Sequence, residues 1–177
     1  MLCKNLFRLA ILCFLVAGIP HFLTANPRTT PIDVYVIVDS STAMERVKDD
    51  ALGWLSSVII DTMLRSDDRI WIWTAGSSPR LIYSGTLENK ELAKTALRSI
   101  QFDGSTADYR SALLEAQVLA RRSDRITYTL LVSSSAAADQ TDRETELAGL
   151  LRYSRVESFP GWRVITVGLD LENRVRR

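Results

Sequence analysis

The residues with the most evident chemical potential form one cluster, Asp39 to Thr42. An aspartate and three hydroxyl residues follow directly on the apolar run 33–38. A turn of this composition can hold a hard metal ion through its oxygens, hold a phosphate, or cap the helix that follows. The elements around the cluster decide between these uses.

The first 25 residues have the pattern of an export signal. Lys4 and Arg8, with no acidic residue beside them, precede the apolar stretch 9–18, which is the order found in secretory signal peptides. We expect cleavage after Ala25, and the alternative is an uncleaved membrane anchor. The protein is therefore expected to be exported, to the periplasm, the cell surface or the surrounding medium.

The expected mature chain contains neither histidine nor cysteine, because His21, Cys3 and Cys13 all lie in the export signal. Histidine-activated nucleophiles, zinc sites built from thiolates or imidazoles, and disulfides are thereby excluded. Loss of Lys4 and Arg8 leaves 20 basic and 21 acidic residues, a net charge of −1. No basic excess points to a nucleic-acid partner, so none is expected.

Strand and helix patterns alternate along the rest of the chain. A polar linker is expected at 26–32 and a short basic tail at 171–177. Strands are predicted at 33–39, 68–76, 79–85, 125–134 and 161–170, and helices at 44–64, 89–100, 108–123 and 141–156. Apolar runs without alternation are typical of parallel strands, and the short turn before residue 79 predicts a hairpin. The pattern predicts one α/β domain over 33–170, with a doubly wound, mostly parallel sheet, one antiparallel edge strand and helices on both faces.

Helical spacing also predicts which side chains face the core. In 44–64 they are Val47, Ala51, Leu55, Val58 and Thr62. In 108–123 they are Tyr109, Ala112, Leu113, Ala116 and Leu119. In a doubly wound sheet, ligands bind outside the carboxyl ends of the strands, so residues 39–43 and 133–140 are expected to border the binding crevice.

The chain resembles a von Willebrand factor type A (vWA) domain in this order of elements and in local sequence. The family's first strand ends in Asp-x-Ser-x-Ser, and DSSTAM supplies Asp39 and Ser41. Its Gly-x-Thr turn before a helix resembles FDGSTADYRSALLEA, which puts Thr106 at the family's threonine. SDDRIWIW and SFPGWRVITVGLD resemble two further strands. The resemblance implies the Rossmann-like fold of that family over nearly the whole mature chain.

In this family the loops form a metal-ion-dependent adhesion site, where Mg²⁺ binds a carboxylate of a partner protein. The resemblance implies Asp39, Ser41 and Thr106 as ligands, but Ala43 replaces the second serine and Ser134 the second aspartate. A single carboxylate compensates the dehydration of Mg²⁺ poorly, so weakly bound Mg²⁺ or no cofactor is expected. The candidate substitute ligands are Ser134, Asp103, Asp108 and Asp139.

The remaining alternative for the cluster is structural, with Ser41 or Thr42 capping the first helix and Asp39 accepting backbone N–H groups. The sequence favours an exported, non-enzymatic adhesion or scaffold module, which binds a protein partner through loops at the carboxyl end of the sheet. One alternative is a metal-free scaffold subunit that binds through a helix face or a sheet edge. Another is a phosphatase with Asp39 as nucleophile, although Ser41 stands where such enzymes place a second aspartate. Membrane contact is expected only through an uncleaved N-terminal segment.

Overall fold

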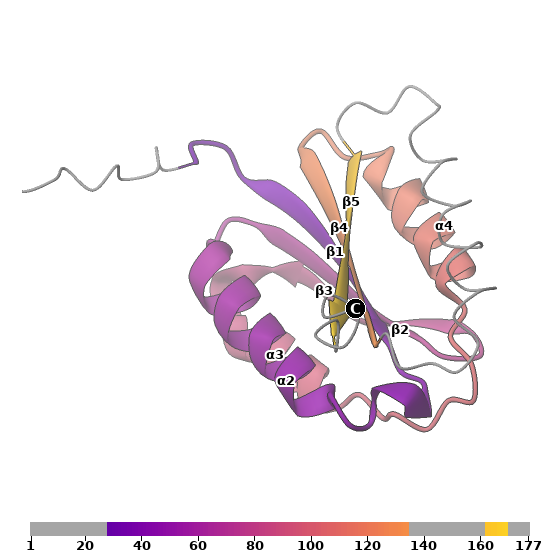
Figure 1. Ribbon diagram of the computed structural model, residues 1–177. Helices are drawn as coiled ribbons and strands as arrows, with labels where there is room; N and C mark the ends of the chain where they lie inside the picture. Colours follow the sequence, from indigo (N-terminus) through magenta and orange to yellow (C-terminus); the bar gives the residue numbers. More distant parts are fainter. Residues whose placement is uncertain (1–27, 135–161, 170–177) are drawn as a thin grey trace, which may run out of the picture.

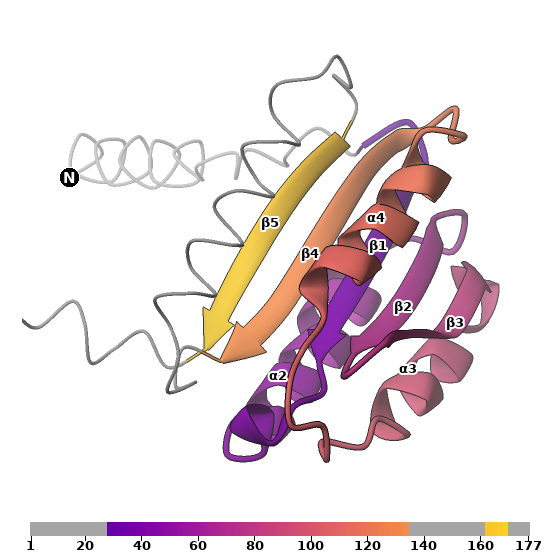
Figure 2. The ribbon, with the colours of Figure 1, turned by 90° about the vertical axis from the view of Figure 1, so that its right-hand side faces the viewer.

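A five-stranded sheet in the order β3-β2-β1-β4-β5 forms the centre of the molecule (Figures 1 and 2). The computed structural model describes residues 28–134 and the backbone of 162–169. The strands are β1 Ile32–Asp39, β2 Arg69–Ala75, β3 Pro79–Thr86, β4 Ile126–Ser134 and β5 Trp162–Leu169. β1 pairs in parallel with β2 and β4, β4 pairs in parallel with β5, and β3 is antiparallel to β2. The predicted mostly parallel sheet with one antiparallel edge strand is confirmed.

Helices cover both faces of this sheet. They are the 3₁₀ turns η1 Thr42–Met44 and η3 Leu87–Asn89, the π-helix η2 Leu55–Met63, and the α-helices α2 Lys48–Trp54, α3 Lys90–Arg98 and α4 Tyr109–Ala120. Figure 2 shows α4 on one face and α2 and α3 on the other. Within the described part of the chain, no helix has the length and apolar character needed to cross a membrane. The predicted signal 1–25, helix 141–156 and tail 171–177 lie outside the described residues.

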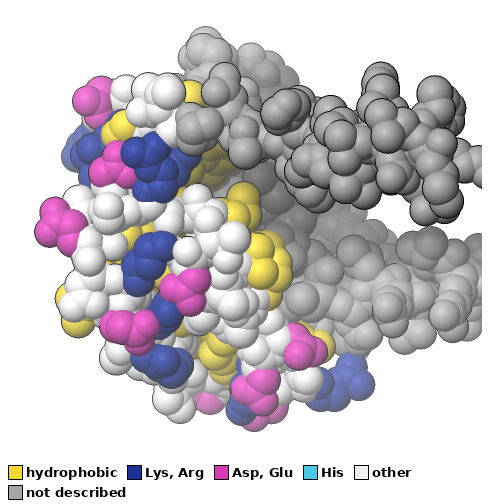
Figure 3. Space-filling view, turned by 90° about the vertical axis from the view of Figure 1, so that its left-hand side faces the viewer, with side chains coloured by type: hydrophobic (Ala, Val, Ile, Leu, Met, Phe, Trp, Pro, Cys, Tyr) yellow, Lys and Arg dark blue, Asp and Glu magenta, His cyan; other side chains and the backbone are white. Residues whose placement is uncertain are grey.

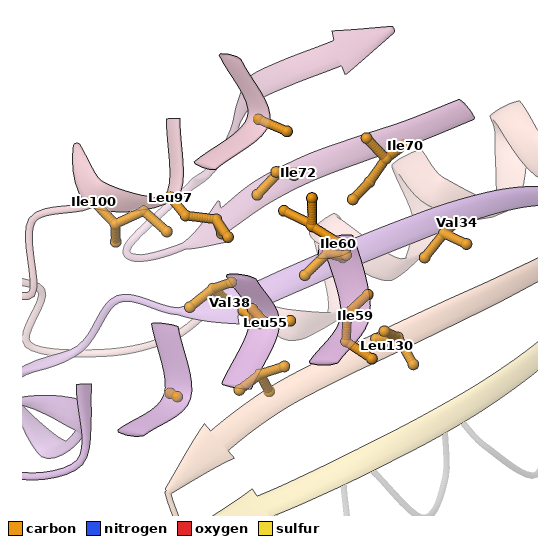
Figure 4. Packing of buried hydrophobic residues seen from close by; sticks show 14 of the residues in the cluster. Val34, Val38, Leu55, Ile59, Ile60, Ile70, Ile72, Leu97, Ile100 and Leu130 are labelled. Carbon is orange, nitrogen blue, oxygen red and sulfur yellow. The ribbon is translucent and has the colours of Figure 1, made fainter. Parts of the chain in front are cut away.

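Alternate side chains of β1 enter two separate hydrophobic cores. Val34, Val36 and Val38 pack beneath α2, η2 and α3, whereas Tyr35 and Ile37 pack beneath α4. Figure 4 shows the first of these cores, with side chains from β1 and β2 meeting those of η2 and α3. Burial on both faces explains why the sequence of β1 is apolar between Asp33 and Asp39.

The first helix differs from its prediction in where it begins and in its type. The sequence predicts one α-helix over 44–64, but α2 starts only at Lys48 and gives way to the π-helix η2 at Leu55. π-Helices mostly occur as single turns inserted in α-helices, and η2 is nine residues long. No propensity rule for α-helices would have indicated it.

The π-helix also changes which side chains are buried. Val58 is 37% exposed and Thr62 is exposed, whereas Ile59, Ile60 and Leu64 are buried. The amide of Leu64 donates to the carbonyl of Ile59 at 3.0 Å, five residues back, so each turn holds more residues than an α-turn. The predicted burial of Val58 and Thr62 is therefore wrong, because it assumed a period of 3.6.

The helix that borders the predicted crevice agrees with its prediction. Ala112, Leu113 and Ala116 of α4 are buried, and Tyr109 and Leu119 are partly buried against the same core. Asp108 caps the helix, its carboxylate accepting the amide of Ser111 at 2.9 Å. This cap fixes the start of α4 and with it the position of Tyr109.

Two buried aspartates close the opposite end of the sheet, where the parallel strands begin. Arg69 donates two hydrogen bonds to Asp33, each 2.7 Å long. Arg28 donates two to Asp68, which also accepts the amides of Ile32 and Arg65. Burial alone would raise the pKa of Asp68, but the hydrogen bonds from Arg28 and from the two amides hold it below its usual value. The segment before β1 is thus attached to the fold.

Candidate functional site

Asp39 is the last residue of β1, at the edge of the sheet where the sequence places a binding crevice. Its side chain is fully buried. One carboxylate oxygen, Oδ1, accepts the amide of Ser41 at 2.8 Å. The other, Oδ2, lies 2.5 Å from the hydroxyl of Tyr109 and 2.9 Å from that of Ser133. Both oxygens are therefore occupied by donors of the protein itself.

Tyr109 and Ser133 complete a triangle with Asp39, since their hydroxyl oxygens lie 2.7 Å apart. Two hydroxyl hydrogens serve these three contacts. Tyr109 donates to Asp39, and Ser133 donates either to Asp39 or to Tyr109. The triangle joins the end of β1, the first residue of α4 and the end of β4.

Ser41 is the second residue of the predicted site and is 1% exposed. Its amide binds Asp39, but in the described part of the chain its hydroxyl is buried without a hydrogen-bond partner. Ser41 precedes η1 without a capping bond from its side chain. The structural alternative predicted that Asp39 accepts backbone N–H groups and that Ser41 or Thr42 caps the helix. Asp39 does accept a backbone amide, whereas the side chain of Ser41 forms no cap.

Backbone hydrogen bonds hold three loops of this edge together. Two bonds join the segment after β1 to the loop before α4. The amide of Thr42 donates to the carbonyl of Gly104 at 2.8 Å, and the amide of Gly104 donates to the carbonyl of Ser40 at 3.1 Å. The segment after β1 also joins the end of β2 through Ser40 N–H to the carbonyl of Ala75 at 3.2 Å. Asp108 N–H reaches the carbonyl of Gly76 at 2.8 Å. We call these three segments, 40–44, 76–78 and 103–108, the loop platform.

Gly104 lies where two of these loops pair, and a side chain there would be crowded. A Cβ atom at this position would lie 3.2 Å from the carbonyl oxygen of Ser40 and 3.3 Å from that of Thr106. Both neighbours are backbone atoms within the platform. Glycine therefore lets the loop before α4 pair with the segment after β1.

The other predicted site residues lie around this edge without joining the triangle. Thr106 and Asp103 are exposed in the loop before α4. Asp108 uses one carboxylate oxygen to cap α4, and Ser134 is buried at the end of β4. Asp139 lies outside the described residues.

Sequence reasoning did not assign Tyr109 and Ser133 to the site. Tyr109 is predicted only as a core-facing residue of its helix, and Ser133 only as part of the segment 133–140 that borders the crevice. Their contacts with Asp39 span 70 and 94 residues. The one local signal was a polar hydroxyl at a core-facing helix position, because a buried tyrosine hydroxyl needs a hydrogen-bond partner.

Mg²⁺ is the ion that the resemblance implies, and these contacts do not fit it. Mg²⁺ needs a near-octahedral shell of oxygens, usually with one or two carboxylates. Each oxygen of Asp39 already accepts a protein donor, and the other predicted ligands, Ser41 and Thr106, would add only neutral hydroxyl oxygens. Among the residues that the structure describes, no three His, Cys, Asp or Glu side chains gather in a group that could hold a metal.

Comparisons by sequence identify no relative, since no protein-family model matches the chain and no curated protein does. Solved structures do match. The von Willebrand factor type A protein from Catenulispora acidiphila is 15% identical at a TM-score of 0.58, over 78% of this chain and 33% of that one. The chain thus spans about a third of the length of that structure.

Two further structures match over the same share of this chain. The SpRpn10 VWA domain is 11% identical at a TM-score of 0.52, over 78% of this chain and 89% of that domain. Proximal thread matrix protein 1 from the mussel byssus, with a zinc-occupied MIDAS motif, is 14% identical at a TM-score of 0.52, over 78% and 35%. At these identities the likeness shows the fold alone. The chain has the fold of a von Willebrand factor type A domain.

Proposed function

We propose that this chain is an exported, non-enzymatic interaction module of the vWA type, which binds a protein partner through the loop platform with weak or no dependence on divalent metal. The observation that carries the proposal is that three backbone hydrogen bonds join the three loops to one another and a fourth joins Ser40 to the end of β2. Loops held in one arrangement lose little conformational entropy when a partner binds. A preorganised surface at the carboxyl end of an α/β sheet is a favourable place for recognition.

The chemistry of the platform indicates how it would recognise a partner. Its exposed side chains include five hydroxyls, those of Thr42, Ser77, Ser78, Ser105 and Thr106. These groups both donate and accept hydrogen bonds and carry no charge. These hydroxyls therefore suit a partner that offers backbone or side-chain hydrogen-bonding groups. They suit less well a partner whose carboxylate would bind a metal ion held in the site.

The burial of Asp39 argues against the phosphatase alternative. A nucleophilic aspartate must reach the phosphorus atom of its substrate, but the side chain of Asp39 is fully buried and both its oxygens accept hydrogen bonds. Ser41 also offers no carboxylate to act as the acid. We therefore favour a binding function over a catalytic one.

The helix-face alternative is less well supported than the platform. On the face shown in Figure 3, acidic and basic side chains are interspersed. Along α3, Lys94 pairs with Asp61 at 2.7 Å and with Glu91 at 2.9 Å, and Arg98 also reaches Glu91. Such paired surface charges are typical of a solvated helix face.

Site-specific photocrosslinking in the producing cell tests this proposal. A photoreactive amino acid is placed at Thr42 or Thr106 on the platform, at Leu92 on α3, or at Leu81 on the edge strand β3. All four side chains are exposed. We expect a discrete protein adduct from the two platform positions, unchanged when a chelator is present. Adducts from Leu92 or Leu81 alone would instead indicate the scaffold alternative, and chelator-sensitive adducts would indicate a functional metal site.

A further inference from the structure

We propose that the hydroxyl groups of Tyr109 and Ser133 take the place of a cation at Asp39, so that a hydrogen-bonded triangle holds the crevice together without metal. This inference concerns the architecture of the crevice and holds whichever partner the platform binds. It assigns a role to two residues that the predicted adhesion site does not include.

The first argument is the occupancy of the carboxylate. Oδ1 of Asp39 accepts the amide of Ser41, and Oδ2 lies within hydrogen-bond distance of both hydroxyls. Each oxygen thus already accepts at least one protein donor, and a cation would have to share that oxygen with the donor or displace it. The other predicted ligands, Ser41 and Thr106, would add only neutral hydroxyl oxygens, which are too little to offset the dehydration of Mg²⁺.

The second argument is the charge of Asp39. A buried carboxylate is costly unless it is paired with a cation or hydrogen-bonded. No Lys or Arg among the described residues forms an ion pair with Asp39, whereas Asp33 and Asp68 each have an arginine partner. Hydrogen bonds to an ionised acceptor are stronger than those between neutral groups. The amide of Ser41 and the hydroxyl of Tyr109 therefore stabilise this buried charge, and Ser133 adds to them either directly or by donating to Tyr109.

The third argument is the set of segments that the triangle joins. According to the resemblance, a bound ion would link the loop after β1, the loop before α4 and the segment after β4. Asp39, Tyr109 and Ser133 adjoin those three segments, at the end of β1, the start of α4 and the end of β4. The triangle thus makes the cross-link that a cation would otherwise make.

The test compares three forms of the full chain, the wild type, Tyr109→Phe/Ser133→Ala and the matched control Tyr83→Phe/Ser99→Ala. The control removes the same two hydroxyls from surface sites, where they donate to the carbonyls of Thr86 and Ala96. Thermal unfolding is followed with excess EDTA, Mg²⁺ or Mn²⁺, and Mn²⁺ binding is measured by titration calorimetry. Asp39→Asn reports whether any metal effect passes through this carboxylate.

We expect the wild-type midpoint to be the same in EDTA, Mg²⁺ and Mn²⁺. The midpoint of Tyr109→Phe/Ser133→Ala should fall by roughly 5 °C relative to the control variant, because two buried hydrogen bonds are lost. Its carboxylate, which has lost the two hydroxyl donors, should also bind Mn²⁺ on the order of tenfold more tightly than the wild type does. If the double variant does not fold, Ser133→Ala alone, which keeps the donor of Tyr109, is compared with Ser99→Ala.

Two outcomes would overturn the inference. One is a wild-type midpoint that Mn²⁺ raises or EDTA lowers, with the effect absent in Asp39→Asn, because the crevice would then rely on a cation. The other is a double variant, or a single Ser133→Ala variant, that unfolds at the midpoint of its control. In that case the two hydroxyls would not support the crevice.

Discussion

At the scale of single residues, Gly104 is the glycine of the loop platform at which an added Cβ atom would press on backbone oxygens. Its missing side chain lets two loops pair through the bonds between Thr42 and Gly104 and between Gly104 and Ser40. A methyl group here would press on the carbonyl oxygens of Ser40 and Thr106 at 3.2 and 3.3 Å. Because those atoms belong to hydrogen-bonded backbone, they have little freedom to move aside.

We therefore predict that Gly104→Ala lowers the free energy of unfolding by about 1–3 kcal/mol, the usual cost of overpacking. Gly53→Ala is the matched control, since a Cβ there meets no atom within 4 Å and the residue lies in α2. That change should raise stability by up to ~1 kcal/mol through helix propensity. Urea unfolding measures the free energy of unfolding of both variants. An equal change in this free energy for Gly104→Ala and Gly53→Ala would show that the platform tolerates a side chain at position 104.

Asp68 offers a second test at the scale of single residues, through its dependence on pH. Its pKa is lower in the folded protein than in the unfolded chain because of Arg28 and two amides. The stability it contributes is present above the pKa of the unfolded state and is lost as the pH falls through the folded-state value. We predict that the wild type loses more stability between neutral pH and acid than Asp68→Asn does.

At neutral pH, Asp68→Asn should cost about 3 kcal/mol, because it leaves Arg28 without its partner. Asp67→Asn is the matched control, since Asp67 is exposed and pairs only at the surface with Arg65. That variant should be close to neutral. Urea unfolding at several pH values checks both statements. Parallel pH profiles for the wild type and Asp68→Asn would rule out a role for Asp68 in acid sensitivity.

At the scale of elements, the sequence predicts the strands and the presence of a helix after β1, but it does not predict that part of this helix is the π-helix η2. The strands were predicted well because runs such as DVYVIVD are apolar on both faces and bounded by polar turns. The existence of a helix after β1 was also predicted. Its period was not, because a change from i→i+4 to i→i+5 bonding leaves no mark in composition.

The altered period of η2 predicts an unusual pattern of mutational sensitivity. Ile59→Ala and Ile60→Ala should each lower the free energy of unfolding by about 2–5 kcal/mol, because both side chains are buried in the core. Val58→Ala should cost less than about 1 kcal/mol, since Val58 is 37% exposed. Denaturant unfolding of the three variants checks the register. A large loss for Val58 with small losses for the isoleucines would indicate a regular α-helix instead.

At the scale of the whole molecule, the candidate site shows a limit of local sequence patterns. Asp39 and Ser41 could be placed at the crevice from the sequence because they are neighbours in one motif at the end of one strand. Tyr109 and Ser133 could not be recognised as partners of Asp39, because those partners are fixed only when β1, α4 and β4 are packed together. The fold brings them within 2.9 Å of the carboxylate. The chain shares its fold with a protein whose MIDAS motif holds zinc, and the surroundings of Asp39 are set by contacts that span 70 and 94 residues of this chain.

If the crevice is one unit of the whole fold, its loops should open together rather than one by one. The amides of Thr42, Gly104 and Asp108 are bonded across loops, so we predict that they exchange with deuterium more slowly than those of exposed Ser77, Ser78 and Ser105. Tyr109→Phe should speed exchange at all three bonded amides by a similar factor, because it weakens the triangle beneath them. Amide exchange followed by NMR measures this, with Tyr83→Phe as the control. Acceleration confined to Asp108, the residue beside the substitution, would mean that the loops are held independently and that the triangle acts only on its own helix.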